Sequence, residues 1–175
     1  MKIVRHGNPN GLDIDYKVYV NSRSEIRDLH IHLMNSGYFF LYQKGDIPFT
    51  PESDKLIVLH YIDKNLKLYD FAFIFPETPK KTEERIKSEF DLELDKAYAK
   101  AKHDTAFRET LMKYMRLHVL LQAFAKHLKA YGTMTEPYQE LFKAVLARVK
   151  RQTKLELNGD SIRELDRRVK QFFGV

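Results

Sequence analysis

The residues that could carry acid–base chemistry are a histidine and an aspartate in two neighbouring hydrophobic segments. His60 lies within residues 55–63 (KLIVLHYID), and Asp70 lies within residues 66–75 (LKLYDFAFIF). Burial and a nearby carboxylate can tune a histidine close to neutral pH. A neutral histidine that is hydrogen-bonded inside a core is the more common structural outcome, and Asp70 as a partner would support either interpretation.

A second pattern is an acid followed two residues later by a lysine, Asp15-x-Lys17, at the start of an expected strand. Some nucleases hold Mg²⁺ with such a triplet, but they need another acid upstream on a separate strand, and Asp13 is too close in sequence. We therefore expect no metal site here. The chain also has neither a Gly-x-x-x-x-Gly-Lys loop nor a Gly-x-Gly-x-x-Gly turn, so no nucleotide-binding motif is visible in the sequence.

The segment Val4-Arg5-His6-Gly7 resembles the opening of the histidine phosphatase family. The resemblance implies a phosphorylated His6 at the end of a strand, with arginines and a second histidine around the phosphoryl group. It covers four residues, and no later Arg-x-x-Gln-Thr segment supplies the second arginine. A chance match in an irregular lead-in, residues 1–15, is the simpler interpretation.

The segment Asp28-x-His30-x-His32 is similar to the metal-binding strand of amidohydrolases, which would imply one metal held by both histidines. Here, however, Ser22 and Glu25 have capping-box spacing, and Gly37 is a helix stop. We therefore expect a helix from about Ser22 to Gly37. Residues two apart on a helix point in divergent directions, so these histidines should not share an ion.

The basic surplus of the chain is concentrated near its C-terminus. From Lys143 to Val175 there are nine basic and four acidic residues, whereas the whole chain has a net charge of +6 and a pI near 9.3. Such residues can coat a solvated helix face, contact an acidic protein, or bind phosphates by releasing counterions. The predicted nucleic-acid-binding residues are Arg148, Lys150, Arg151, Lys154, Arg163, Arg167, Arg168 and Lys170.

Many of the 22 Tyr and Phe residues fall in expected strands. If one sheet face were open, its rings could stack on bases or form a protein interface. We expect most of them to be core instead, because aromatic residues dominate burial in ordinary domains. They include Tyr38, Phe39, Phe40, Tyr42, Tyr61, Tyr69, Phe71, Phe73 and Phe75.

The segregation of strands and helices along the chain predicts an α+β fold. Residues 1–76 should form a small, mostly antiparallel sheet with one helix, and residues 77–175 a four-helix region, the two folding together. Strands are expected at residues 16–20, 38–43, 55–63 and 66–75, with a short Lys64-Asn65 link between the last two. The later helices are expected at about residues 79–101, 104–131, 135–152 and 160–172.

Composition narrows the functional classes. With 175 residues, 43% hydrophobic and no cysteine, the chain can bury a core but has no disulfides, thiol catalysis or cysteine-held metals. No segment has the length of a membrane span, and no secretory signal is visible, so we expect a cytoplasmic protein. The leading prediction is a non-enzymatic nucleic-acid-binding protein, in a larger assembly or oligomer, without cofactor, metal or catalytic residues. The alternatives are a protein–protein scaffold and, third, a small hydrolase or phosphatase-like enzyme.

Overall fold

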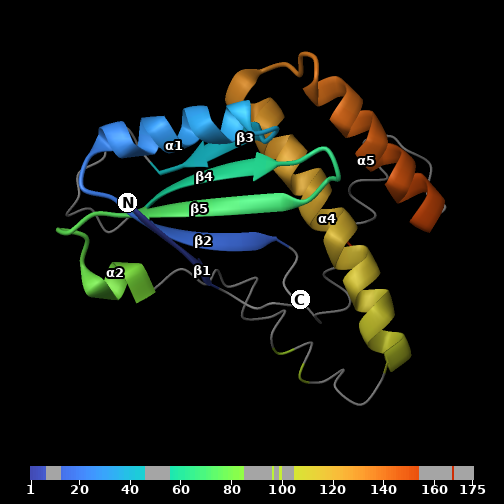
Figure 1. The fold of residues 1–175 in the computed structure, drawn as a ribbon. Coiled ribbons are helices and arrows are strands. Elements are labelled where there is room, and N and C mark those ends of the chain that lie inside the picture. The colour runs from blue at the N-terminus through green and yellow to red at the C-terminus, as the bar shows by residue number, and fades with distance from the viewer. Residues whose placement is uncertain are drawn as a thin grey trace. The chain divides into compact units, whose positions relative to one another are not determined.

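The computed structural model describes residues 1–6, 13–45, 56–84, 96, 99, 105–153 and 167. The chain divides into two compact units, Met1–Ile86 and Lys87–Val175 (Figure 1). The first unit holds a sheet and the second holds helices, so the predicted α+β class is confirmed. Whether the two units fold together stays a prediction.

The first unit is built on a five-stranded mixed sheet. Its central strand is β5, and the order across the sheet is β1-β2-β5-β4-β3. Strands β2 and β5 run parallel, whereas the other neighbouring pairs run antiparallel, so the expected antiparallel arrangement is confirmed only in part. The strands are β1 (Lys2–His6), β2 (Ile14–Tyr19), β3 (Phe39–Lys44), β4 (Ile57–Ile62) and β5 (Leu68–Ile74).

Strand β1 lies in the segment that the sequence analysis expected to be irregular, and that expectation is wrong. Lys2 to His6 pair in register with Tyr19 to Asp15 of β2. The first four residues of β1 are exposed, Ile3 and Val4 among them. An edge strand of this kind is held by its ladder of backbone hydrogen bonds to β2 rather than by burial, and hydrophobic patterning therefore does not predict it.

Helix α1 (Arg23–Asn35) confirms the helix predicted around the histidines at 30 and 32. Its first turn differs from a capping box, because the Ser22 hydroxyl bonds to Ser24 rather than to the backbone. The Glu25 carboxylate makes the expected return contact one residue earlier, accepting the backbone N–H of Asn21 at 2.5 Å. The chain leaves the helix through Gly37 at φ +91°, a conformation that costs glycine little.

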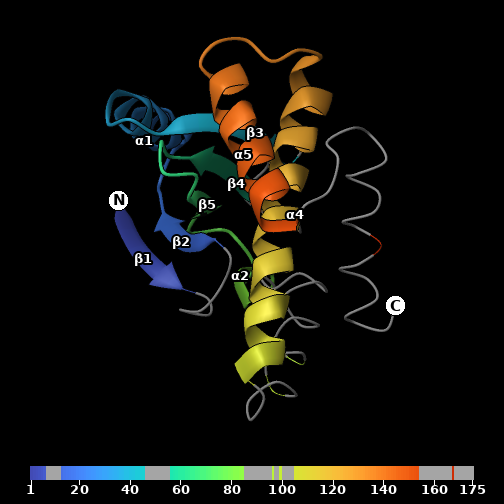
Figure 2. The same ribbon diagram turned by 90° about the vertical axis from the view of Figure 1, so that its right-hand side faces the viewer.

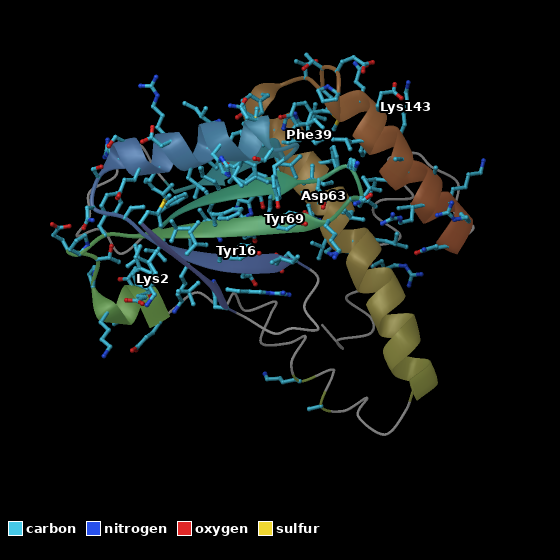
Figure 3. All side chains as sticks on the ribbon, viewed as in Figure 1. Lys2, Tyr16, Phe39, Asp63, Tyr69 and Lys143 are labelled. Carbon is cyan, nitrogen blue, oxygen red and sulfur yellow. The ribbon has the colours of Figure 1, made fainter. Side chains whose placement is uncertain are left out.

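The turn between β4 and β5 is longer than the predicted two-residue link and is organised by Asp63. The Asp63 carboxylate accepts the backbone N–H groups of Asn65 at 2.8 Å and Lys67 at 3.0 Å. Its second oxygen accepts the Tyr69 hydroxyl at 2.8 Å (Figure 3). These bonds hold Leu66 at φ +63°, a left-handed conformation that non-glycine residues seldom adopt. The predicted antiparallel hairpin is confirmed.

The core of the first unit lies between the sheet and α1, which runs along one sheet face (Figure 1). Leu29 and Leu33 of α1 pack there with alternate strand residues. Most aromatic residues of the sheet therefore belong to the core, as expected. Their rings contact one another; the ring centroids of Tyr16 and Phe71, for example, are 5.0 Å apart. The buried residues of this core that lie in the strands or directly after them are Val18, Val20, Ile57, Leu59, Tyr61, Tyr69, Phe71, Phe73 and Phe75.

After β5 the chain forms the short helix α2 (Lys80–Glu84). The Tyr19 hydroxyl of β2 donates to Glu83 Oε1 at 2.6 Å, which ties α2 to the sheet. The expected helix over residues 79–101 is thus described at its first turn and at residues 96 and 99, which are helical. The helix predicted over residues 160–172 lies almost entirely outside the described residues, so the four-helix region is confirmed only in part.

The second unit contains α4 (Thr105–Tyr131) and α5 (Tyr138–Thr153), which lie side by side (Figure 2). Phe124 of α4 contacts Phe142 of α5 with their ring centroids 5.3 Å apart. His127 of α4 stacks on Tyr138 of α5 with a centroid distance of 4.3 Å. Leu141, Val145 and Val149 of α5 are buried, and the bounds of the helix agree with those predicted for it to within three residues at its start and one at its end. Neither of these helices, nor any other described one, is both long and apolar enough to cross a membrane.

Candidate functional site

A row of polar and aromatic side chains crosses the sheet, one from each strand. His6 of β1 pairs with Asp15 of β2, and Asp15 pairs with Asp70 of β5. Asp70 pairs with His60 of β4, which in turn pairs with Tyr42 of β3. Directly paired residues project to the same side of a sheet. These five side chains, here named the polar row, therefore share one face.

The polar row lies on the sheet face opposite α1. Residues next to it along the strands, such as Tyr16, Tyr61 and Phe71, belong to the core beneath α1 or pack against it. Because successive side chains of a strand point to opposite faces, the polar row points away from that helix. All five residues are half-buried. The polar row is therefore carried by strand residues rather than by a loop, with His6 at the end of the edge strand β1.

His60 and Asp70 form the closest contact of the polar row. Nδ1 of His60 lies 2.5 Å from Oδ1 of Asp70, and their side chains are 12% and 22% exposed. Because a carboxylate can only accept, His60 is the donor. The Tyr42 ring stacks on the His60 ring, with 4.0 Å between the ring centroids and 14° between the ring planes. The ring of His60 is thus fixed on two sides, and it holds the Asp70 carboxylate in one orientation.

Three carboxylates meet at the β2–β5 part of the polar row. One oxygen from each of Asp13, Asp15 and Asp70, here named the carboxylate triplet, lies within 4.8 Å of the others. No metal site was expected from the sequence, because no upstream acid on a separate strand accompanies Asp15. An acid on a separate strand is nevertheless present: Asp70, downstream in the sequence, lies on the strand that pairs with β2. Lys17 follows Asp15 by two residues and so shares the same face.

The charges of the site act on the groups around it. Burial raises the pKa of Tyr42 well above its ordinary value, and the negative charges of Asp70 and Asp13 raise it further. Burial lowers the pKa of His6 below 6.5, the charge of Lys17 lowers it further, and Asp70 opposes the change. His6 is therefore neutral at pH 7 and can accept a proton.

Acidification should destabilise the first unit. Burial lowers the pKa values of both His6 and His30 below 6.5. Below that value the unfolded chain binds more protons than the folded chain, so stability falls as pH falls. We expect urea midpoints followed at unit-1 amides to drop between about pH 7.5 and about pH 5.5, above the range of the carboxylates. A His30→Gln variant should show a smaller drop, and an unchanged or rising midpoint in the parent chain would contradict this.

The predicted basic residues are only partly placed. Arg148 is half-buried, and Lys150 and Arg151 are exposed in the last turns of α5. None of these three makes an ion pair within the described part of the chain. Arg167 is described and exposed. Lys154, Arg163, Arg168 and Lys170 lie outside the described residues, so a continuous basic surface stays a prediction.

The two motif resemblances have different outcomes. His30 and His32 lie on α1, and His30 Nδ1 contacts the Tyr61 hydroxyl at 2.7 Å while His32 is exposed, so they do not form one site. His6 does lie at the end of a strand, but its neighbour there is Asp15. Gly7 is outside the described residues. His6 thus enters the candidate site through its pairing with β2.

The chain matches no protein-family model, no curated protein and no solved structure at a significant level. The geometry of the first unit is therefore the basis for a function. Sequence reasoning found the His60–Asp70 pair from the hairpin but missed its continuation through Asp15 and His6. An isolated aspartate in the middle of the apolar strand β5 was the signal that pointed to the polar row.

Proposed function

We propose that the polar row, together with Asp13 and Lys17, binds a divalent metal ion and hydrolyses phosphodiester bonds. The observation that carries the proposal is the carboxylate triplet, which adjoins a histidine on each side along the polar row and has Lys17 next on the same strand face. The site thus combines oxygen ligands, a proton acceptor and a cation on one rigid surface. Such a combination is what metal-assisted hydrolysis of an anionic ester requires.

The donor chemistry favours Mg²⁺ or Mn²⁺. Carboxylate oxygens are hard ligands, and these ions prefer them over the softer donors that select zinc or copper. Asp70 uses Oδ1 for His60, which leaves Oδ2 for an ion. His60 then acts as a positioning residue, because a hydrogen bond of this kind fixes the orientation of a metal ligand and tunes its basicity.

The remaining residues fit the steps of the reaction. A bound divalent ion would lower the pKa of a coordinated water and polarise a phosphoryl oxygen. His6, neutral at pH 7, can take the proton that this water loses as its oxygen forms the new P–O bond. Lys17 can stabilise the negative charge that develops on the phosphoryl oxygens. The products would be a phosphomonoester and the alcohol released as the second P–O bond breaks, and the leaving oxygen would take its proton from solvent.

A second candidate function is nucleic-acid binding through the C-terminal basic residues, without catalysis. The observation in its favour is that Lys150 and Arg151 are exposed together at the end of α5. An acidic protein is the alternative partner for the same residues. If both functions hold, the phosphodiester is a nucleic acid, and its affinity should fall steeply with salt because bound counterions are released.

A cleavage assay tests the proposal. The full chain, with Mn²⁺ or Mg²⁺, should hydrolyse bis(p-nitrophenyl) phosphate and a single-stranded oligonucleotide, and excess EDTA should abolish both activities. The Lys17→Met variant should lower the rate by about 100-fold or more. The matched control is Lys64→Met, an exposed lysine in the β4–β5 turn. Activity that survives EDTA, or falls equally in both variants, would contradict the proposal; oligonucleotide binding without cleavage would favour the second candidate.

A further inference from the structure

A second feature of the first unit is a cavity of about 340 Å³ on the α1 side of the sheet. It lies where α1 faces strands β3 and β4, on the opposite face of the sheet from the polar row. The volume falls at the lower end of the range of small-molecule sites. Because the cavity and the polar row lie on opposite faces of the sheet, the inference drawn from the cavity does not depend on the proposed hydrolytic function.

The wall that the sheet contributes to this cavity is apolar. Ile57 and Leu59 of β4 line it and are 7% and 5% exposed. Phe40 of β3 also belongs to this wall, and Ile26 of α1 adds an apolar side chain from the facing helix. Both are half-buried. Because Ile57 and Leu59 are already buried, a ligand would remove apolar surface from water mainly at Phe40 and Ile26, and this burial is the main source of affinity in such sites.

The α1 side of the cavity is basic. Arg23 and Arg27 are four residues apart, so they lie on the same face of α1, and His30 follows at the next turn. The described lining residues include no carboxylate. His30 is held in place by its 2.7 Å contact with the Tyr61 hydroxyl. The cavity thus joins an apolar wall to a positively charged rim.

We propose that this cavity binds a small organic anion with an apolar body and one anionic head group. The body would lie against Phe40 and Ile26, and the head group would meet the guanidinium group of Arg27. A hydrogen bond between charged partners contributes more than a neutral one, so the head group should set the specificity. A neutral ligand of the same shape keeps the apolar contacts and loses this contribution.

Isothermal titration calorimetry with 2-naphthoate, and with naphthalene-2-carboxamide as its neutral counterpart, tests this site. The naphthoate should bind at one site, and the carboxamide should bind about 10-fold more weakly. The Arg27→Gln variant should weaken naphthoate binding by about 10-fold and leave carboxamide binding unchanged. Arg5→Gln, which removes an exposed arginine of β1, should bind naphthoate as the parent chain does.

Three results would overturn the proposal: no binding of naphthoate, equal affinities for the acid and the amide, or equal losses in the Arg27 and Arg5 variants. An Ile26→Phe variant provides a second arm, because a larger side chain in the wall should reduce the affinity for both ligands. The metal-dependent cleavage assay should be unaffected by naphthoate. Loss of cleavage therefore says nothing against this cavity, and loss of naphthoate binding says nothing against the polar row.

Discussion

Replacing Asp15 with asparagine is expected to lower metal-dependent hydrolysis by at least about 100-fold, because outer-shell changes alone cost up to that much and Asp15 would be a direct ligand. Asparagine keeps the size of the side chain and a neutral oxygen but removes the negative charge. Asp15 is half-buried and lies between His6 and Asp70, so the loss falls at the centre of the site. Single-turnover rates with saturating Mn²⁺ measure the effect.

The matched control is Asp28→Asn on the exposed surface of α1, which should leave the rate unchanged. The thermal midpoint of the Asp15 variant without metal should equal or exceed that of the parent chain. Three close carboxylates repel one another, and removing one charge relieves that repulsion. Full activity in the Asp15 variant, or the same loss in the Asp28 variant, would contradict its role as a ligand.

The Phe73→Ala substitution should destabilise the first unit by about 3–5 kcal/mol. Phe73 has 0% exposure and lies in the central strand, in register with Val18 of β2 on one side and Ile57 of β4 on the other. The substitution removes buried apolar contacts and leaves a cavity that rigid strands on both sides cannot fill. Amide hydrogen exchange in β4 and β5 reports this loss separately from the second unit.

The comparison for Phe73 is Phe39→Ala in the edge strand β3, where the side chain is half-buried. The Phe39→Ala substitution should lower the free energy of unfolding by less than half as much, because side chains around an edge position can shift toward solvent and fill the space. Equal losses at the two positions would show that the core is not centred on β5. A loss of unfolding free energy below about 1 kcal/mol for Phe73→Ala would also show that the core is not centred on β5.

Elements with strong local signals could be predicted from the sequence. The apolar spacing and the stop at Gly37 specify α1, and two hydrophobic runs around a polar turn specify the β4–β5 hairpin. The hairpin places Asp70 on the strand next to His60, but the predicted two-residue link would set His60 opposite Tyr69. The longer observed turn brings His60 opposite Asp70. The burial of the sheet aromatics followed from their number and from their alternation along the strands.

The rest of the site depends on contacts between residues that are distant in sequence. The parallel pairing of β2 with β5 places Asp15 beside Asp70, and nothing local to either strand indicates this pairing. The exposed edge strand β1 lacks a hydrophobic pattern, yet it brings His6 to the end of the polar row. The residues of the proposed metal site were therefore visible in the sequence, but their proximity was not.

Titration of the metal-free chain with Mn²⁺, followed by calorimetry and by the electron paramagnetic resonance of free Mn²⁺, tests the central claim most directly. The polar row predicts one Mn²⁺ site that is lost when Asp15 or Asp70 is replaced by asparagine and kept in the Asp28→Asn control. It also predicts broadening of the NMR signals of His6 and His60 by the bound ion, with His32 unaffected. No saturable binding, or binding that survives both substitutions, would contradict the account.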